Sequence, residues 1–322
     1  MNLSKLSVFL LFLVITPTYA QLCSGTKVIL LDSIDYNVEP NWQLVFDEEF
    51  MGDTLDLANW ELVVYKQGAF DGTGAYWTLD NVKVSPETVY GACTKATGVC
   101  RIVAKKETVT KPPVSWNPSI PEATYNFTTS NINTKRFFGW GKYEIRCKVP
   151  KGKGFFPAFW LYGEKYGDGH EIDIFEFMNE YNLLQKYDSD KLCKYIQMHY
   201  HKADNSNPNN RPDYNCGSTH KTNVDYSLDF HTYSVIWNKF GISWYVDGEF
   251  VKMVAQWYDI RGEAVTPENI KPAQVVFRND WYPKNEMQMI IGMDIQHGKD
   301  LPDENTPFPS YLDIDYIRYY SY

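Results

Sequence analysis

Three carboxylates stand close together in one short stretch of the chain, residues 170–178. Glu171 and Asp173 are two positions apart, so on a β-strand their side chains lie on the same face. Glu176 breaks this alternation, because it follows Glu171 by five positions. One extra residue at 174–175, a β-bulge, would return Glu176 to the face of the other two. We therefore predict a bulged strand that carries three acids on one face.

This arrangement suits the chemistry of glycoside hydrolysis. With the bulge, Glu171 and Glu176 are four strand steps apart, about 13 Å between Cα atoms at ~3.3 Å per step. Side chains that lean inward by ~4 Å each leave the carboxyl groups about 5 Å apart, the separation that retaining glycosidases use. Asp173 lies between them, where its charge would hold a proton on Glu176 and orient Glu171.

Two different interpretations of the cluster are open on these residues alone. An acidic strand face is often simply solvated, without any catalytic role. Clustered carboxylates also bind Ca²⁺, although residues 170–178 lack the glycine turn and carbonyl spacing of a loop site.

The segments around the cluster have the patterns of β-strands, and no long helical pattern with caps stands out. Asp247-Gly248 is a hairpin signal between two such segments. Polar loops at 202–229 and 267–284 are expected to shape a binding cleft. The spacing predicts an all-β, antiparallel sandwich. The strand patterns lie at residues 42–46, 142–149, 233–237, 242–246, 249–251 and 311–320.

The N-terminus has the pattern of an export signal. Lys5 precedes an unbroken apolar run, residues 6–15, and a small residue, Ala20, ends the segment. The run is well short of the ~20 residues that a membrane helix needs. We predict a signal peptide at 1–20 and a secreted or periplasmic protein with no membrane association after cleavage. Because no linker or repeat follows, a single domain is expected at 21–322.

Charge and cysteine content narrow the class of protein further. The formal net charge is −9, which disfavours nucleic acid and anionic membranes as partners and weakly disfavours polyanionic substrates. There are six cysteines, and export permits disulfides. Cys93 and Cys100 bracket a short turn, and Cys193 and Cys216 flank a polar loop, so these two pairs are predicted.

The stretch Glu171-Ile-Asp-Ile-Phe-Glu176 resembles the E-x-D-x-x-E signature of glycoside hydrolase family 16. Flanking motifs resemble that family in the same order, from about residue 45 to residue 320. They are Phe138-Gly-Trp-Gly-Lys-Tyr-Glu-Ile-Arg-Cys, Phe156-Pro-Ala-Phe-Trp-Leu-Tyr-Gly163, His231-Thr-Tyr-Ser-Val-Ile-Trp237, Trp244-Tyr-Val-Asp-Gly248 and Asp315-Tyr-Ile-Arg-Tyr-Tyr320.

The resemblance implies a β-jelly-roll sandwich with a concave substrate cleft and a retaining, endo-acting glycosidase without a catalytic cofactor. Glu171 would be the nucleophile, Glu176 the general acid/base and Asp173 the supporting acid. The expected partner is a polysaccharide, with β-1,3- or β-1,3(1,4)-glucan ahead of marine galactans such as agar, porphyran or carrageenan. A non-catalytic glycan-binding protein and a transglycosylase are also compatible with the resemblance, and the chain is expected to be a monomer.

The resemblance also suggests substrate-binding and metal-binding residues. Strand parity would turn Glu144 and Arg146, and likewise Trp160 and Tyr162, away from the core and into the cleft. Other positions either match further binding residues of the family or differ from its usual residues. His199 and Asn81 resemble substrate-binding positions, Glu49 and Asp315 resemble the acidic ligands of a structural calcium, and Gly292 and Asp294 stand where many members have Asn and often Trp.

Overall fold

Strict alternation of buried and partly exposed side chains marks the central strands of the computed structural model. It runs through β10 (Gly141–Lys148) and β11 (Phe155–Gly163) without interruption. Each strand therefore turns one row of side chains into a core and the other row away from it. The structure describes residues 26–30, 41–63, 74–112, 121–163, 169–177, 192–202, 216–271, 274–279 and 282–321.

Two eight-stranded sheets dominate these residues, and both are antiparallel except for one short parallel pair, β4 with β9. The first sheet has the order β17-β16-β15-β10-β21-β6-β5, and β2 also pairs with β21. Its further strands are β2 (Gln43–Glu48), β5 (Val82–Tyr90), β6 (Lys95–Ala104), β15 (His231–Trp237), β16 (Gly241–Val246), β17 (Glu249–Ala255) and β21 (Ser310–Ser321).

The second sheet has the order β14-β13-β12-β11-β20-β9-β3. Its further strands are β3 (Trp60–Leu62), β4 (Tyr76–Trp77), β9 (Thr128–Thr134), β12 (His170–Glu176), β13 (Tyr195–Lys202), β14 (Ser218–Lys221) and β20 (Gln288–Ile295).

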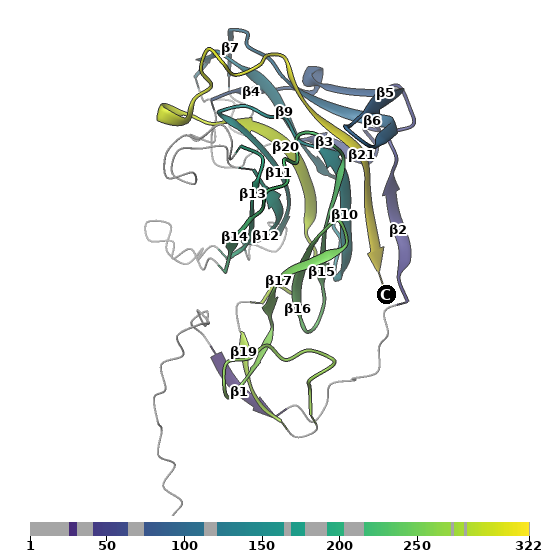
Figure 1. Ribbon diagram of the computed structural model, residues 1–322, viewed down its shortest axis with the longest axis vertical. Coiled ribbons are helices and arrows are strands. Elements are labelled where there is room, and N and C mark those ends of the chain that lie inside the picture. The colour runs from purple at the N-terminus through teal and green to yellow at the C-terminus, as the bar shows by residue number, and fades with distance from the viewer. Residues whose placement is uncertain are drawn as a thin grey trace, which may run out of the picture.

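The two sheets lie face to face as the layers of a sandwich (Figure 1). One continuous core fills the space between them and takes side chains from both. Tyr143 and Ile145 of the first sheet and Phe159 and Leu161 of the second are fully buried in it. The predicted all-β antiparallel sandwich is therefore confirmed.

Smaller elements complete the described part of the chain. A three-stranded sheet, β1-β19-β18, lies at one end of the molecule in Figure 1, and β7 pairs with β8. No helix in the described ranges is long and apolar enough to cross a bilayer. The strands are β1 (Thr26–Leu30), β7 (Val109–Lys111), β8 (Ala123–Tyr125), β18 (Trp257–Asp259) and β19 (Val275–Asn279), with 3₁₀ helices η1 (Leu79–Asn81) and η3 (Gly298–Asp300).

The sequence signals for strands and turns agree with this structure. Asp247 and Gly248 both have positive φ, +50° and +83°, as the two central residues of a tight hairpin between β16 and β17 require. The segment 267–284, expected to be a polar loop, instead contains β19, which pairs with β1 and β18. The predicted signal peptide, 1–20, lies outside the described residues.

Both predicted disulfides are wrong. Cys93 is an exposed thiol in the β5–β6 turn, whereas Cys100 is buried well along β6 with its side chain in the core. Seven residues of extended chain separate their Cα atoms by roughly 20 Å, far beyond the ~7 Å limit for a disulfide. Cys193 keeps its thiol, with Sγ 3.2 Å from the carbonyl oxygen of Pro150. Cys216 is disulfide-bonded, so its partner is not Cys193.

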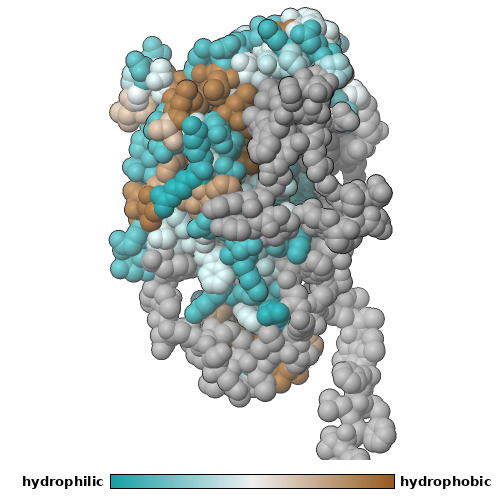
Figure 2. Space-filling model, turned by 180° about the vertical axis from the view of Figure 1, so that it is seen from behind, coloured by the Kyte–Doolittle hydropathy of each residue, from teal (hydrophilic) through white to brown (hydrophobic). Residues whose placement is uncertain are grey.

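Of the residues coloured in Figure 2, most are hydrophilic, and the main apolar group lies in the upper left of the view. Such a surface suits the acidic composition and does not single out a site. The candidate site must therefore be built from the side chains of the second sheet.

Candidate active site

The three carboxylates lie on β12 with the predicted bulge between them. Along the β11–β12 pair, Asp173 is opposite Trp160 and Phe175 is opposite Phe159, so Ile174 is the extra residue. The β12–β13 register shifts at the same place. Ile174 and Phe175 are both fully buried, and Glu176 returns to the face of Asp173.

The register also fixes the spacing of the two glutamates. Glu171 is opposite Tyr162 and Glu176 is opposite Ala158, four residues apart on the neighbouring strand. Four strand steps correspond to about 13 Å between Cα atoms. The bulge therefore gives the spacing that the sequence predicted.

Two histidines of β13 contact the acids of β12. Nδ1 of His199 lies 2.9 Å from Oε2 of Glu176, and Nε2 of His201 lies 3.1 Å from Oδ2 of Asp173. Asp173 and Glu176 are only 2% and 9% exposed. These buried carboxylates therefore have imidazole partners from the adjacent strand.

Electrostatics within the cluster favour retention of a proton. Burial raises the pKa of Glu171 well above its usual range, and the nearby charges of Asp173 and Glu176 raise it further, whereas His201 lowers it. Burial and the neighbouring acids therefore favour the protonated form of Glu171 in the unliganded protein.

The back of β12 is held by the first sheet. The indole Nε1 of Trp244 donates to the backbone oxygen of Asp173 at 2.7 Å across the core. Lys252 stacks its ammonium 4.5 Å from the centre of the Trp244 ring and donates to the backbone oxygen of Met198. Burial lowers the pKa of Lys252 to about 7, and Asp173 opposes this shift.

Aromatic side chains extend the carboxylate face across the sheet. Trp160 and Tyr162 belong to a small apolar cluster with Trp77 and Ile290, separate from the main core, and their rings lie 5.7 Å apart. Both therefore point outward, as parity predicted. The indole Nε1 of Trp77 donates to Oδ1 of Asp294 at 2.7 Å, and burial raises the pKa of Asp294 to about 7.

Two glycines leave room for polar side chains on this face. A Cβ at Gly292 would overlap the carboxamide of Asn131 on β9, and a Cβ at Gly217 would overlap the imidazole of His199. The carboxamide of Asn131 therefore occupies the space that a side chain at 292 would need.

The structure does not bring Glu144 and Arg146 to this face. Parity turns them away from the core, but β10 belongs to the first sheet, so they lie on the opposite side of the sandwich. Glu144 accepts from the Tyr316 hydroxyl at 3.1 Å, and Arg146 pairs with Asp315. The prediction that Glu144 and Arg146 bind substrate beside the carboxylates is therefore wrong.

Asn81 is a structural residue and has no exposed surface. Its Nδ2 donates to the Val103 oxygen and the Thr128 hydroxyl, each at 2.9 Å, and its Oδ1 accepts from Lys105 at 2.8 Å. Both amide hydrogens are used and the side chain has no exposed surface, so this arrangement does not present Asn81 to a sugar as predicted.

The predicted calcium ligands have cationic partners instead. Oε1 of Glu49 accepts from Nε of Arg318 at 2.7 Å, and Asp315 pairs with Arg146. A Ca²⁺ ion there would have to displace two guanidinium groups whose positive charge repels it. Glu49 and Asp315 do not fit a calcium site in this arrangement.

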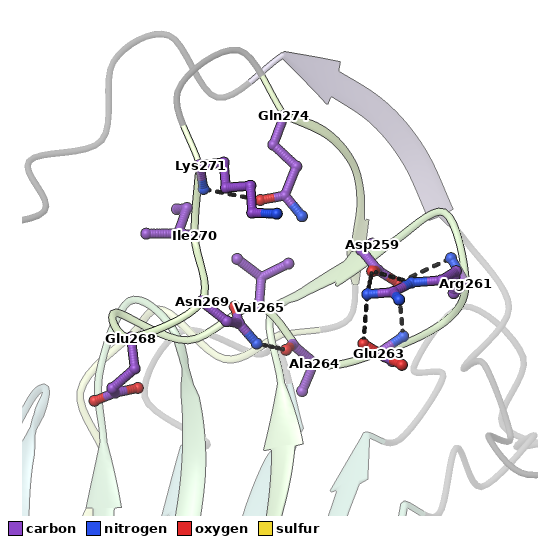
Figure 3. A pocket seen from close by; sticks show the side chains of 10 residues that line it. All are labelled: Asp259, Arg261, Glu263, Ala264, Val265, Glu268, Asn269, Ile270, Lys271 and Gln274. Atoms are coloured by element: carbon purple, nitrogen blue, oxygen red, sulfur yellow. Dashed lines mark hydrogen bonds and ion pairs between the residues drawn. The ribbon is translucent and has the colours of Figure 1, made fainter.

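A pocket of about 260 Å³ lies elsewhere, beside β18 (Figure 3). Arg261 donates to Asp259 at 3.0 Å and to Glu263 at 2.7 Å, and Asn269 donates to the Ala264 oxygen at 2.8 Å. These polar side chains form hydrogen bonds within the turn to which they belong. The carboxylate face of the second sheet is therefore the better candidate for chemistry.

Comparison with known proteins agrees with the geometry. A family model described as glycosyl hydrolases family 16 matches residues 92–300, which include all three carboxylates. This chain belongs to glycosyl hydrolases family 16. Its family-16 relatives include glucan endo-1,3-beta-glucosidase A1 of Niallia circulans, 26% identical over 86% of this chain and 37% of that protein.

Two further relatives have similar sequence identity to this chain. The kappa-carrageenase of Pseudoalteromonas carrageenovora is 26% identical over 70% of this chain and 55% of that protein. The catalytic domain of an endo-1,3-beta-glucanase (laminarinase) from Thermotoga petrophila superposes with a TM-score of 0.61 and 25% identity over 88% of this chain and 98% of that one. The chain spans less than two thirds of the length of both curated relatives.

Several residues around the carboxylate face are not singled out by the sequence. His201 shares the polar face of its strand with His199, and this spacing of two is the only local signal for it. The contacts of Trp77 with Asp294 and of Lys252 with Trp244 join segments separated along the chain, and no local pattern indicates them.

Asn81→Ala should destabilise the fold without weakening substrate binding. It removes three hydrogen bonds, two of them buried, and takes the Asn81 donor from the Val103 oxygen, so we expect a loss of roughly 2–4 kcal/mol in the free energy of unfolding. Thermal unfolding measures this, with exposed Asp80→Ala as the control. An unchanged Tm with a KM raised tenfold or more would instead make Asn81 a sugar ligand.

Lys252→Met should stabilise the protein more at low pH than at high pH. The pKa is about 7 folded against an ordinary value of 10.5, so the folded state binds fewer protons between these values. The contribution of Lys252 to the free energy of unfolding therefore rises with pH across that window and is least favourable below pH 7.

The gain in Tm on Lys252→Met should be larger at pH 6 than at pH 9, by roughly 5–10 °C, equivalent to about 2–3 kcal/mol, because about two pH units of this interval lie above the folded pKa. Exposed Lys83→Met is the matched control and should show no such difference. Equal gains at both pH values would mean that the ammonium of Lys252 is not desolvated.

Proposed function

We propose that this chain is a retaining, endo-acting glycosidase that hydrolyses a neutral β-glucan with β-1,3 or mixed β-1,3 and β-1,4 linkages. The observation that carries this proposal is the bulged strand, which puts Glu171 and Glu176 on one face at four strand steps. Carboxyl groups that lean together from this spacing are about 5 Å apart, room for a sugar carbon but not for an additional attacking water.

The spacing of the two glutamates suits a double displacement. Glu176 protonates the leaving oxygen while Glu171 attacks the anomeric carbon and forms a glycosyl-enzyme. Glu176 then removes a proton from the water that releases the sugar. Burial raises the pKa of Glu171 in the unliganded protein, and the neighbouring imidazole of His201 opposes this shift. Asp173 stands between them and orients both. No step requires a cofactor.

A neutral substrate is favoured by the charges on the carboxylate face. The strands β3, β9, β11, β12 and β20 contain no Lys or Arg, the side chains that pair with sulfate groups. Asp294 and Glu61 add carboxylates to the same face, and Asn133 donates to Glu61 at 3.0 Å. Trp160 and Tyr162 offer ring faces for stacking on sugars.

The relatives include enzymes named for two classes of substrate, glucans and galactans. The Niallia and Thermotoga proteins are described as acting on 1,3-β-glucan, whereas the Pseudoalteromonas relative is a kappa-carrageenase. Hydrolysis of a marine galactan is therefore the second candidate function, and the lack of basic residues on these five strands disfavours its sulfated forms. We also propose a single catalytic domain at 21–322, export by residues 1–20, and a monomer.

A substrate panel tests the class of polysaccharide. Reducing-end release should be at least about tenfold faster on laminarin or lichenan than on porphyran or kappa-carrageenan, because each sulfate would lie among carboxylates on strands without Lys or Arg. Neutral agarose separates charge from linkage within the panel. Preference for a sulfated galactan would overturn the glucan assignment and leave the glycosidase assignment intact.

The stereochemistry of the product tests the mechanism. Proton NMR of an early digest should show the β-anomer first, because two displacements retain the configuration. Glu171→Gln should lower kcat by about 10⁴-fold or more with an unchanged circular dichroism spectrum. Azide should rescue Glu171→Gly on an activated glycoside and give the inverted product. An initial α-anomer from the unmodified enzyme would contradict the proposal.

A further inference from the structure

Four side chains of the carboxylate face bring metal-binding atoms together. Asp173, Glu176, His199 and His201 each offer one such atom, and all four atoms lie within 4.8 Å of one another. Two come from β12 and two from β13, adjacent strands of the second sheet. The bulge on β12 aligns the acids, and the spacing of two on β13 aligns the imidazoles.

The donor set matches one chemical class of ion. Two imidazole nitrogens with two carboxylate oxygens suit Zn²⁺ and similar first-row dications, whereas Ca²⁺ and Mg²⁺ prefer oxygen ligands throughout. Ligand atoms at ~2.0 Å from a tetrahedral Zn²⁺ are about 3.3 Å from one another. The two imidazole–carboxylate contacts, 2.9 and 3.1 Å, are already close to this spacing.

The ligands are also held in place by contacts behind them. Trp244 donates to the backbone oxygen of Asp173, and Gly217 leaves the space that the His199 ring occupies. Asp173 and Glu176 are buried, so few water contacts are lost when they bind an ion. Small rotations of four side chains would close the set around one ion.

We infer that this face binds one Zn²⁺ ion through Asp173, Glu176, His199 and His201, and that the ion inhibits the enzyme reversibly. Inhibition rests on the proposed function, because the ion takes the general acid/base and the supporting acid out of the reaction. Zinc binding itself does not rest on it. The proposed zinc site thus shares Asp173 and Glu176 with the catalytic site, so zinc binding competes with catalysis.

Isothermal titration of untagged, EDTA-treated protein with ZnCl₂ alone tests the site. We expect one Zn²⁺ per chain, and no binding of CaCl₂ or MgCl₂ at the same concentrations. His199→Gln and His201→Gln should each weaken Zn²⁺ by more than about tenfold, since even outer-shell changes cost that much. His231→Gln is the matched control, because His231 pairs with Asp247 on the first sheet. Circular dichroism checks the fold of each variant.

The activity arm uses laminarin hydrolysis by the unmodified enzyme. Zn²⁺ should lower the rate in proportion to its occupancy, and EDTA should restore it. Full-strength Zn²⁺ binding in both histidine variants, equal binding of Ca²⁺, or occupancy without loss of rate would overturn the inference. If no polysaccharide is cleaved, the titration still decides the zinc site. If laminarin is cleaved and Zn²⁺ does not bind, only this inference fails.

Discussion

The extra residue at Ile174 is the constraint on which the site depends. Without it, strict alternation would turn either Glu171 or Glu176 into the core, where an unpaired carboxylate is costly. The bulge satisfies both sides of the strand, because Ile174 and Phe175 fill the core while three acids share the outer face. Apolar packing behind β12 and carboxylate chemistry in front of it are therefore consequences of the same local irregularity.

The first sheet acts on this strand from behind. Trp244 reaches through the core to the backbone of Asp173, and Lys252 reaches Met198 on the next strand. Both contacts are made at the same edge of the sandwich, close to the bulge. They fix the backbone from which Asp173 and His199 project, so the site is supported by residues that no substrate touches.

Sequence patterns predicted the strands, the hairpin at 247–248 and the bulge, because these depend on local alternation and turn chemistry. Parity also gave the direction of Trp160 and Tyr162 correctly. Parity cannot say which sheet a strand joins, so Glu144 and Arg146 were assigned to the wrong side of the sandwich. The assignments of Asn81 and Glu49 also failed because local patterns do not show contacts between distant segments. Asn81 contacts Lys105, and Glu49 contacts Arg318 of β21.

Gly292 and Asn131 carry a consequence for how this face can change over evolution. The glycine has no side chain, and the amide of the neighbouring strand fills the space that a side chain at 292 would need. A larger residue at 292 would displace Asn131, and a smaller residue at 131 would leave a gap beside Gly292. Substitutions at these two positions are therefore coupled, because a side chain at 292 fits only beside a smaller residue at 131.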